Sequence, residues 1–198
     1  QVEARIITAT NRDLLAEVAE FGEVPTPRGR QFEGGFTGSR DLLGQAAALL
    51  RGAKRPLILA GGGVKNSGSH AAALALPERL GAPVALSPGH GDAVPCTHPL
   101  YAGQVGPRGN LVASDLARRA DVILALGTRL GFNTTFYSYD NLNRDAAIVQ
   151  VEADPSAIGR FFPVALGIAG FAGEVAADLD ALLTDHTPGG EVQDWSSA

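Results

Sequence analysis

The sequence predicts an α/β domain built on a doubly wound parallel sheet with helices on both faces. Three observations support this fold class. Between residues 54 and 184, short aliphatic runs alternate with Ala- and Leu-rich helical segments. The runs are continuously apolar rather than apolar at every second residue, which is typical of strands covered on both faces. Short turns containing glycine connect them, as in repeated strand–helix–strand units.

Each element follows from the local pattern. Residues 1–22 hold a β-branched patch and a helix-like stretch, and residues 23–38 have the Pro- and Gly-rich composition of an exposed linker. Ser39 is placed to cap a helix over Arg40–Gly52, which carries an apolar stripe. The expected strands are Leu57–Ala60, Val84–Leu86, Val122–Leu126, Ile148–Val151 and Val164–Ile168. The expected helices between them are Ser69–Leu80, Leu111–Arg119 and Gly173–Leu183. The tail after Asp185 is expected to fray.

Composition limits the function classes. The 198 residues suffice for one domain with a real core. With 16 Lys and Arg against 21 Asp and Glu, the net charge of −5 argues against nucleic acid or an anionic membrane as a partner. The single cysteine, Cys96, excludes a disulfide framework and an all-Cys zinc site. Without a signal segment or an apolar run of the ~20 residues that span a bilayer, we expect a cytoplasmic protein. The chain starts with Gln and contains no Met, so it is expected to be a piece of a longer product.

A glycine-rich turn follows the first expected strand. Gly61, Gly62 and Gly63 would let the backbone approach a phosphate, and a helix beginning there would add free N–H groups. The spacing does not match the dinucleotide fingerprint, because a GxGxxG pattern started at Gly61 places Asn66 at its last position. The alternative interpretation is that the glycines only permit a tight turn. Both stay open.

A second turn precedes the helix expected at Leu111–Arg119. Asn110 is a natural N-cap, and Arg108 is a mobile cation beside it. With Gly106 and Gly109 in the same turn, a pyrophosphate could rest there. The alternative is a solvated loop with an ordinary surface arginine.

Polar residues also follow two later strands. Gly127, Thr128 and Arg129 come directly after one strand, and Glu152 ends another. Open α/β sheets bind ligands at the carboxyl ends of their strands, and an acid at such an end often accepts a ribose hydroxyl. These four residues are therefore candidates for cofactor binding. Asp154 precedes a proline and is instead expected to cap a helical turn.

The histidines do not form a recognisable site. His90 lies between glycines at a strand end and is a weak catalytic candidate, because no Ser or Cys nucleophile motif accompanies it. The others are too scattered for metal-ligand spacing: His70, His98 and His186. We therefore assign no catalytic and no metal-binding residue. The aromatic residues Phe132, Phe136, Tyr137 and Tyr139 fall in a stretch expected to be neither helix nor strand, which favours an interface.

Taken in order, four segments resemble the central domain of thiamine-diphosphate-dependent enzymes of the acetolactate synthase type. The matching segments are RPLILAGGGVKNSG (55–68), LGAPVALSPGHGDAVPCTHPLYAGQVG (80–106), ARRADVILALGTRL (117–130) and AAIVQVEADPSAIGR (146–160). The resemblance implies six parallel strands in a central domain over 39–185. It makes residues 1–38 the end of a preceding domain and a linker, with residues 186–198 as a C-terminal tail.

In this family the central domain holds FAD in some relatives and ADP or nothing in others. By position, the resemblance implies that a nucleotide would contact Gly61–Gly63, Gly106, Gly109, Gly127, Arg129 and Glu152. One departure stands out: family members commonly have Gly-Asp at the start of the last helix, and here Gly170 precedes Phe171. A ring there removes an acceptor that would contact adenine or ribose.

The resemblance also implies that this chain lacks the residues that bind thiamine diphosphate and its metal ion. Thiamine diphosphate and magnesium need a Gly-Asp-Gly motif, and this sequence contains none. We therefore expect a non-catalytic domain whose parent, a homo-oligomer with flanking pyrimidine- and diphosphate-binding domains, joins or cleaves carbon–carbon bonds of 2-oxo acids or related carbonyls. The alternative is an independent flavin- or ADP-binding module. A nicotinamide oxidoreductase is disfavoured by the glycine spacing.

Overall fold

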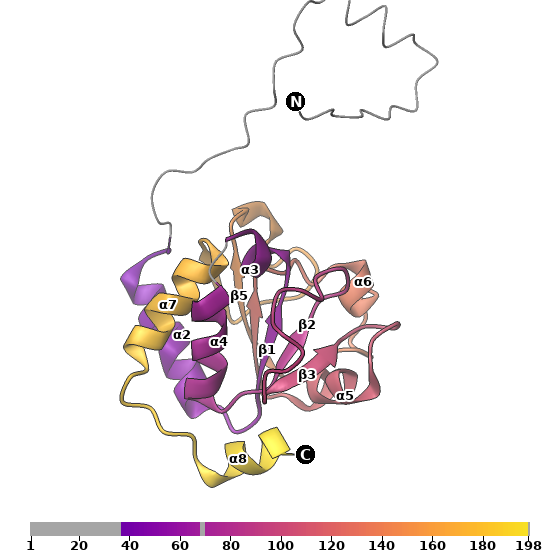
Figure 1. Ribbon diagram of the computed structural model, residues 1–198. Coiled ribbons are helices and arrows are strands. Elements are labelled where there is room, and N and C mark those ends of the chain that lie inside the picture. The colour runs from indigo at the N-terminus through magenta and orange to yellow at the C-terminus, as the bar shows by residue number, and fades with distance from the viewer. Residues whose placement is uncertain (1–36, 68–69, 198) are drawn as a thin grey trace, which may run out of the picture. The chain divides into compact units, whose positions relative to one another are not determined.

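The computed structural model describes residues 37–67 and 70–197, so the elements expected before residue 37 lie outside the described residues. Six parallel strands form one sheet in the order β3-β2-β1-β4-β5-β6 (Figure 1). This confirms the predicted fold class. The strands are β1 (Pro56–Ala60), β2 (Val84–Leu86), β3 (Tyr101–Gln104), β4 (Val122–Leu126), β5 (Ala147–Glu152) and β6 (Leu166–Ala169).

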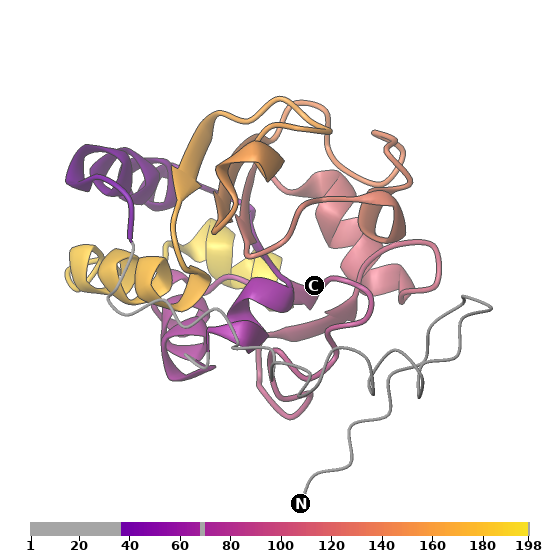
Figure 2. The ribbon, with the colours of Figure 1, turned by 90° about the horizontal axis from the view of Figure 1, so that it is seen from above.

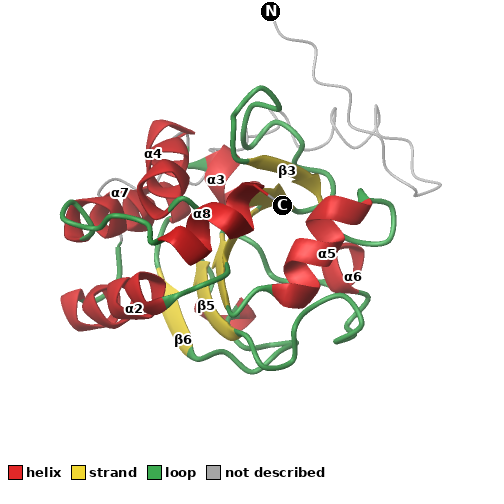
Figure 3. Cartoon of the chain, turned by 90° about the horizontal axis from the view of Figure 1, so that it is seen from below, coloured by secondary structure: helices red, strands yellow, loops and turns green. Residues whose placement is uncertain are grey.

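Helices cover both faces of the sheet. Helices α2 (Arg40–Gly52), α4 (His70–Leu80) and α7 (Ala172–Leu182) lie side by side on one face, and α5 (Leu111–Arg119) covers the other (Figures 2 and 3). The shorter helices are α3 (Gly62–Asn66), α6 (Phe132–Thr135), the 3-10 turn η1 (Pro155–Ala157) and α8 (Gly190–Ser197). No helix in the described part of the chain has the length and apolar character to cross a membrane.

The continuously apolar strands supply two cores, one on each face. Alternate residues of one strand point to opposite faces, so Ile58 packs in the core beneath α2, α4 and α7 while Leu59 packs in the core beneath α5. All five residues of β1 and of β4 are buried. This two-sided burial is why these strands lack the period-two pattern of half-exposed strands.

The three predicted caps are confirmed. The Ser39 hydroxyl accepts a hydrogen bond from Leu42 N at 3.3 Å and begins α2. The Asn110 amide oxygen accepts from Ala113 N at 2.7 Å and begins α5, and the Asp154 carboxylate accepts from Ser156 N at 3.0 Å. Each cap satisfies an N–H that has no partner within its own helix.

The prediction that the tail after Asp185 frays is wrong for residues 190–197. These form α8, in which Val192 and Trp195 are buried. The Trp195 indole N–H donates to Pro56 O at 2.8 Å, and its ring joins the core beneath α5. The tail therefore returns to the start of β1. Its Gly-Gly opening and mostly polar composition concealed a helix that depends on tertiary packing.

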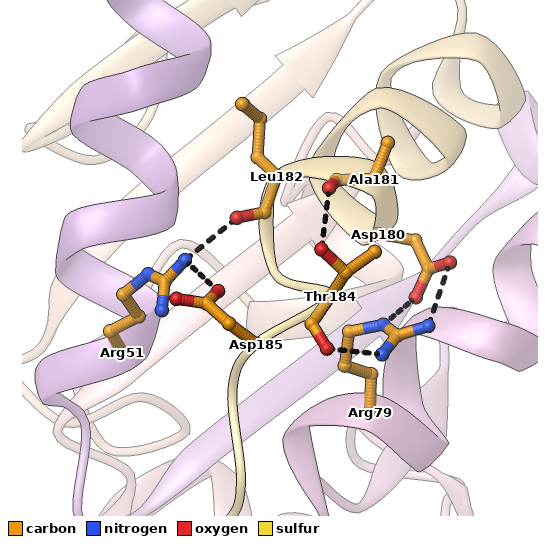
Figure 4. Close-up of polar contacts among 7 residues, drawn as sticks. All are labelled: Arg51, Arg79, Asp180, Ala181, Leu182, Thr184 and Asp185. Atoms are coloured by element: carbon orange, nitrogen blue, oxygen red, sulfur yellow. Dashed lines mark hydrogen bonds and ion pairs between the residues drawn. The ribbon is translucent and has the colours of Figure 1, made fainter.

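Two arginines close the C-terminal end of α7 (Figure 4). Arg51 from α2 donates to Leu182 O at 2.7 Å and to the Asp185 carboxylate at 2.6 Å. Arg79 from α4 forms a two-point ion pair with Asp180. The last carbonyls of a helix lack partners within it and carry partial negative charge, so cations are favourable there. These contacts join the three helices of this layer at one end.

Candidate functional site

The site predicted from the sequence lies at the carboxyl edge of the sheet, where strand order reverses. The chain proceeds from β1 to β2 and β3 on one side, and then places β4, β5 and β6 on the other. Ligands of open α/β sheets bind outside the strand ends at such a point. Gly61–Gly63 follow β1 and Gly127–Arg129 follow the neighbouring β4, so the structure brings these two predicted groups together.

The two glycine turns are bonded to each other. Gly61 N donates to Leu126 O at 3.0 Å, and Gly63 N donates to Gly127 O at 2.9 Å. A Cβ at Gly63 would lie 2.6 Å from Gly127 Cα, and Gly127 has a φ of +61°. Close backbone approach therefore explains glycine at both positions. In this conformation the N–H groups of Gly61 and Gly63 serve the structure, which favours the tight-turn interpretation for these two glycines.

Thr128 is buried and bonds to Ser87 and Gln150, so its side chain is not exposed to a ligand. Its hydroxyl shares a hydrogen bond of 2.7 Å with the Ser87 hydroxyl after β2, and its carbonyl accepts from Gln150 Nε2 at 3.2 Å. Gln150 also accepts from Gly159 N at 2.8 Å through its side-chain oxygen. The buried amide of Gln150 thus fixes two turns at the carboxyl edge. Sequence reasoning missed it, although it is the one polar residue within an otherwise apolar run.

Arg129 is exposed, and the described residues offer its guanidinium no ion pair within 4 Å. It still affects two acids after β5. Its positive charge helps to lower the pKa of Asp154, behind the hydrogen bonds that Asp154 accepts from Ser156. It also opposes the rise in the pKa of Glu152. The Arg129 guanidinium is therefore accessible to a ligand at this edge of the sheet.

Glu152 is buried at the end of β5, with 9% of its surface exposed. Burial raises its pKa, because the charged form loses solvation. A hydrogen bond from Ala153 N to its Oε1 at 3.2 Å and the charge of Arg129 act against this rise. Gly170 N donates to Glu152 O at 3.0 Å, which places Phe171, the residue before α7, close to the same strand end.

The burial of Glu152 predicts a pH-dependent stability. Its pKa is higher in the folded state than the ordinary value of 4.5, so the native state binds more protons above pH 4.5 and stability falls as pH rises through the folded pKa. Glu152→Gln removes this loss. We expect the variant to be the more stable protein at pH 7 and to match the wild type at pH 4 or below, in urea titrations at both pH values. An advantage that is equal at both pH values would exclude ionisation as the cause.

The turn after β3 is also ordered by its own polar groups. Besides capping α5, the Asn110 amide donates to Ala102 O at 2.9 Å, so both ends of its side chain are used. Gly109 N donates to Gly106 O at 2.8 Å and closes the turn. Arg108 is exposed beside it. This turn ends the edge strand β3, two strands away from β1, and the binding role expected for its four residues stays a prediction.

His90 lies against the glycine turn that follows β1. A Cβ at Gly62 would lie 2.7 Å from His90 Cε1, so the imidazole packs directly on that glycine. Lys65 of α3 forms a 2.7 Å ion pair with Asp92 of the same loop. The hydrogen bond from Lys65 is the main cause that lowers the pKa of Asp92. The loop after β2 thus packs on the turn after β1, a contact that no local sequence pattern indicates.

The family described as "Thiamine pyrophosphate enzyme, central domain" matches residues 43–179 of the chain. A sulfoacetaldehyde acetyltransferase of Roseovarius nubinhibens is 45% identical over 151 residues, which are 75% of this chain and 25% of that protein. Another, from Alcaligenes xylosoxydans xylosoxydans, is 42% identical over 85% of this chain and 28% of its own length. An acetolactate synthase large subunit of Corynebacterium glutamicum is 32% identical over 89% of this chain and 26% of its length. The chain thus spans about a quarter of these relatives.

A solved structure shares the fold. It is the X-ray structure of a candidate thiamin diphosphate-dependent enzyme from Mycobacterium smegmatis, with a TM-score of 0.66 and 24% identity. The match covers 83% of this chain and 31% of that one. At this identity the likeness establishes the architecture.

Proposed function

Because the chain belongs to the family of thiamine pyrophosphate enzyme central domains, we propose that it is the non-catalytic middle domain of a larger enzyme. This family membership confirms the resemblance found in the sequence. Among the residues that the structure describes, the donor groups do not suit thiamine diphosphate and its metal. The sequence has no Gly-Asp-Gly, and among the described residues no three His, Cys, Asp or Glu side chains could hold a metal ion. Flanking domains would therefore supply the reacting groups, and this domain would position them.

The reaction of the parent enzyme is proposed from the relatives. The sulfoacetaldehyde acetyltransferases are 45% and 42% identical to the chain, whereas the acetolactate synthase subunit is 32% identical. This difference favours a thiamine pyrophosphate-dependent acetyltransferase acting on sulfoacetaldehyde. The test is to express the complete reading frame that contains this chain and to add thiamine diphosphate with magnesium. Consumption of sulfoacetaldehyde supports the proposal, and formation of acetolactate instead would assign the parent to the second class.

A nucleotide-holding role is the second candidate. Arg129 is exposed near the buried Glu152 and has no ion-pair partner among the described residues, which supports this role. The N–H groups of Gly61 and Gly63, however, already donate to Leu126 O and Gly127 O. The absorption spectrum of the purified chain and nucleotide analysis after denaturation separate the two roles. Copurified FAD or ADP would favour the independent binding module over the structural domain.

Replacing Phe171 with aspartate tests the adenine side of that site. The substitution adds the acceptor that the family commonly has at this position, before the first residue of α7. A hydrogen bond to a charged group contributes about 1.5–3 kcal/mol, which corresponds to roughly 10- to 150-fold in affinity. We expect the Phe171→Asp variant to bind ADP or FAD that much more tightly in a fluorescence titration. Phe171→Leu is the control, since it removes the ring without adding an acceptor. Equal affinities of the two variants would show that the acceptor has no role.

A further inference from the structure

An exposed cluster of rings lies on the segments that follow β4 and β5 at the carboxyl edge of the sheet. It consists of Phe132, Phe136, Tyr137 and Phe161, here named the aromatic patch, with exposed fractions of 53%, 46%, 53% and 37%. Ring centroids are 4.7 Å apart for Phe132 and Phe136, and 4.6 Å apart for Tyr137 and Phe161. The centroids of Phe132 and Tyr137 are 5.7 Å apart, which joins the two pairs into one continuous surface rather than isolated exposed side chains.

This surface differs from the interface expected from the sequence in two ways. Tyr139 turns inward, where its ring meets Phe162 edge-on at 5.1 Å, and Phe161 joins the patch from the loop between β5 and β6. The prediction that this stretch contains no helix is wrong at its start, because Phe132 is the first residue of the short helix α6. Helix α6, which carries Phe132, lies on the α5 side of the sheet, away from α2, α4 and α7 (Figures 2 and 3).

The backbone holds these rings outward at an energetic cost. Phe136 and Tyr137 adopt left-handed φ angles of 51° and 55°, which are rare for bulky residues. Thr135 fixes this conformation, because its hydroxyl donates to Leu130 O at 3.0 Å and accepts from Tyr137 N at 3.1 Å. Asn141 also donates to Thr135 O at 2.9 Å. Strain of this kind, about 1–3 kcal/mol per residue, persists where the surroundings enforce it and concentrates at functional surfaces.

The size of the patch indicates its occupant. Aromatic side chains of about 150–250 Å² each, roughly half exposed, offer about 400 Å² in total. Stable association with a free partner, including a second copy, buries about 800 Å² on each side. Domains of one polypeptide make interfaces of about 600–1,500 Å² in total, and the tether raises their effective concentration to the millimolar range. The patch is therefore large enough for a tethered domain and small for a free partner.

We propose that the aromatic patch docks a neighbouring domain of the same polypeptide through an apolar surface of that domain. In two relatives the segment that matches this chain is only 25% and 28% of their own length, so these proteins are long enough to contain such a neighbouring domain. The proposal rests on the part of the proposed function that places this chain inside a longer protein. It goes further by assigning the surface at which the domains meet.

Hydroxyl-radical footprinting with mass spectrometry tests the assignment on the 198-residue chain and on the product of the complete reading frame. We expect oxidation of the four patch rings to fall several-fold in the longer protein. Tyr139, turned inward in both, should label equally and serves as the internal control. Tyr137→Asp should restore labelling of the other three rings in the longer protein, since aspartate tolerates the left-handed backbone and places a charge in the contact. Its melting temperature in the 198-residue chain should be no lower than that of the wild type, because aspartate relieves the left-handed strain.

Three results would overturn the proposal. The first is equal labelling of the rings in both proteins, and the second is a reading frame that encodes no further domain. The third is a dimer of the 198-residue chain in sedimentation that Tyr137→Asp abolishes, which would assign the patch to a second copy. The acetyltransferase assay is independent of these readouts, so failure of the proposed reaction and failure of the docking surface are distinguishable.

Discussion

Replacing Trp195 with alanine is expected to lower the free energy of unfolding by about 3–5 kcal/mol, the usual range for a buried tryptophan. The ring is 5% exposed and packs in the core beneath α5, and its N–H is the hydrogen-bond donor to Pro56 O at 2.8 Å. Arg119 of α5 lies 5.4 Å above the ring centroid. The substitution therefore removes apolar packing and leaves a carbonyl at the start of β1 without its donor. Urea denaturation followed by circular dichroism measures the change.

The conservative variant separates the two contributions. Trp195→Phe keeps most of the ring packing but loses the indole N–H, so the hydrogen bond alone should account for about 1–3 kcal/mol. Asp194→Ala, at an exposed position of the same helix, is the matched control for α8 itself. If Trp195→Ala were as stable as the wild type, the tail would not be part of the fold, as the sequence alone suggested.

Replacing Gly63 with alanine should destabilise the protein by about 1–3 kcal/mol or more, as expected for overpacking in a tight contact. The added Cβ would lie 2.6 Å from Gly127 Cα, which is backbone and cannot rotate away. The hydrogen bonds from Gly61 N to Leu126 O and from Gly63 N to Gly127 O hold the two turns together. One side or the other must shift, and the carboxyl-edge geometry would shift with it.

Gly44→Ala is the matched control. Gly44 lies inside α2, and a Cβ there would have no atom within 4 Å. The same substitution should therefore stabilise the protein by roughly 0.5–1 kcal/mol, because alanine loses less backbone entropy in a helix. Parallel denaturation curves of the two variants give the comparison. Similar effects of both substitutions would mean that the contact between the turns is not tight.

Much of the fold could be predicted because its central strands are buried on both faces. β1, β4 and β5 appear in the sequence as continuous apolar runs, and the residues that cap α2 and α5 are of the expected types. β3 did not appear as a run, because it is a half-buried edge strand containing glycine and glutamine. α8 could not be predicted, because it is held in place by the Trp195 indole, which bonds to Pro56 in a strand more than a hundred residues earlier.

The sequence could predict that the candidate site lies at the strand ends, but it could not predict the contacts between its residues. The turns containing Gly63 and Gly127 are far apart in sequence and meet because β1 pairs with β4. That pairing follows from strand order, which local patterns do not encode. For the same reason, local patterns do not predict the contact of His90 with Gly62 or the hydrogen bond from Gln150 to Thr128 O. The exposure of the aromatic patch depends on the left-handed backbone conformation of Phe136 and Tyr137. The composition of this stretch does not indicate that conformation.

Isothermal titration of thiamine diphosphate with magnesium into the purified 198-residue chain tests the central claim most directly. If the chain is a middle domain whose chemistry resides in flanking domains, the titration will show no heat of binding beyond dilution. The product of the complete reading frame, titrated under the same conditions, should bind the cofactor saturably. Saturable binding to the 198-residue chain alone would contradict this account.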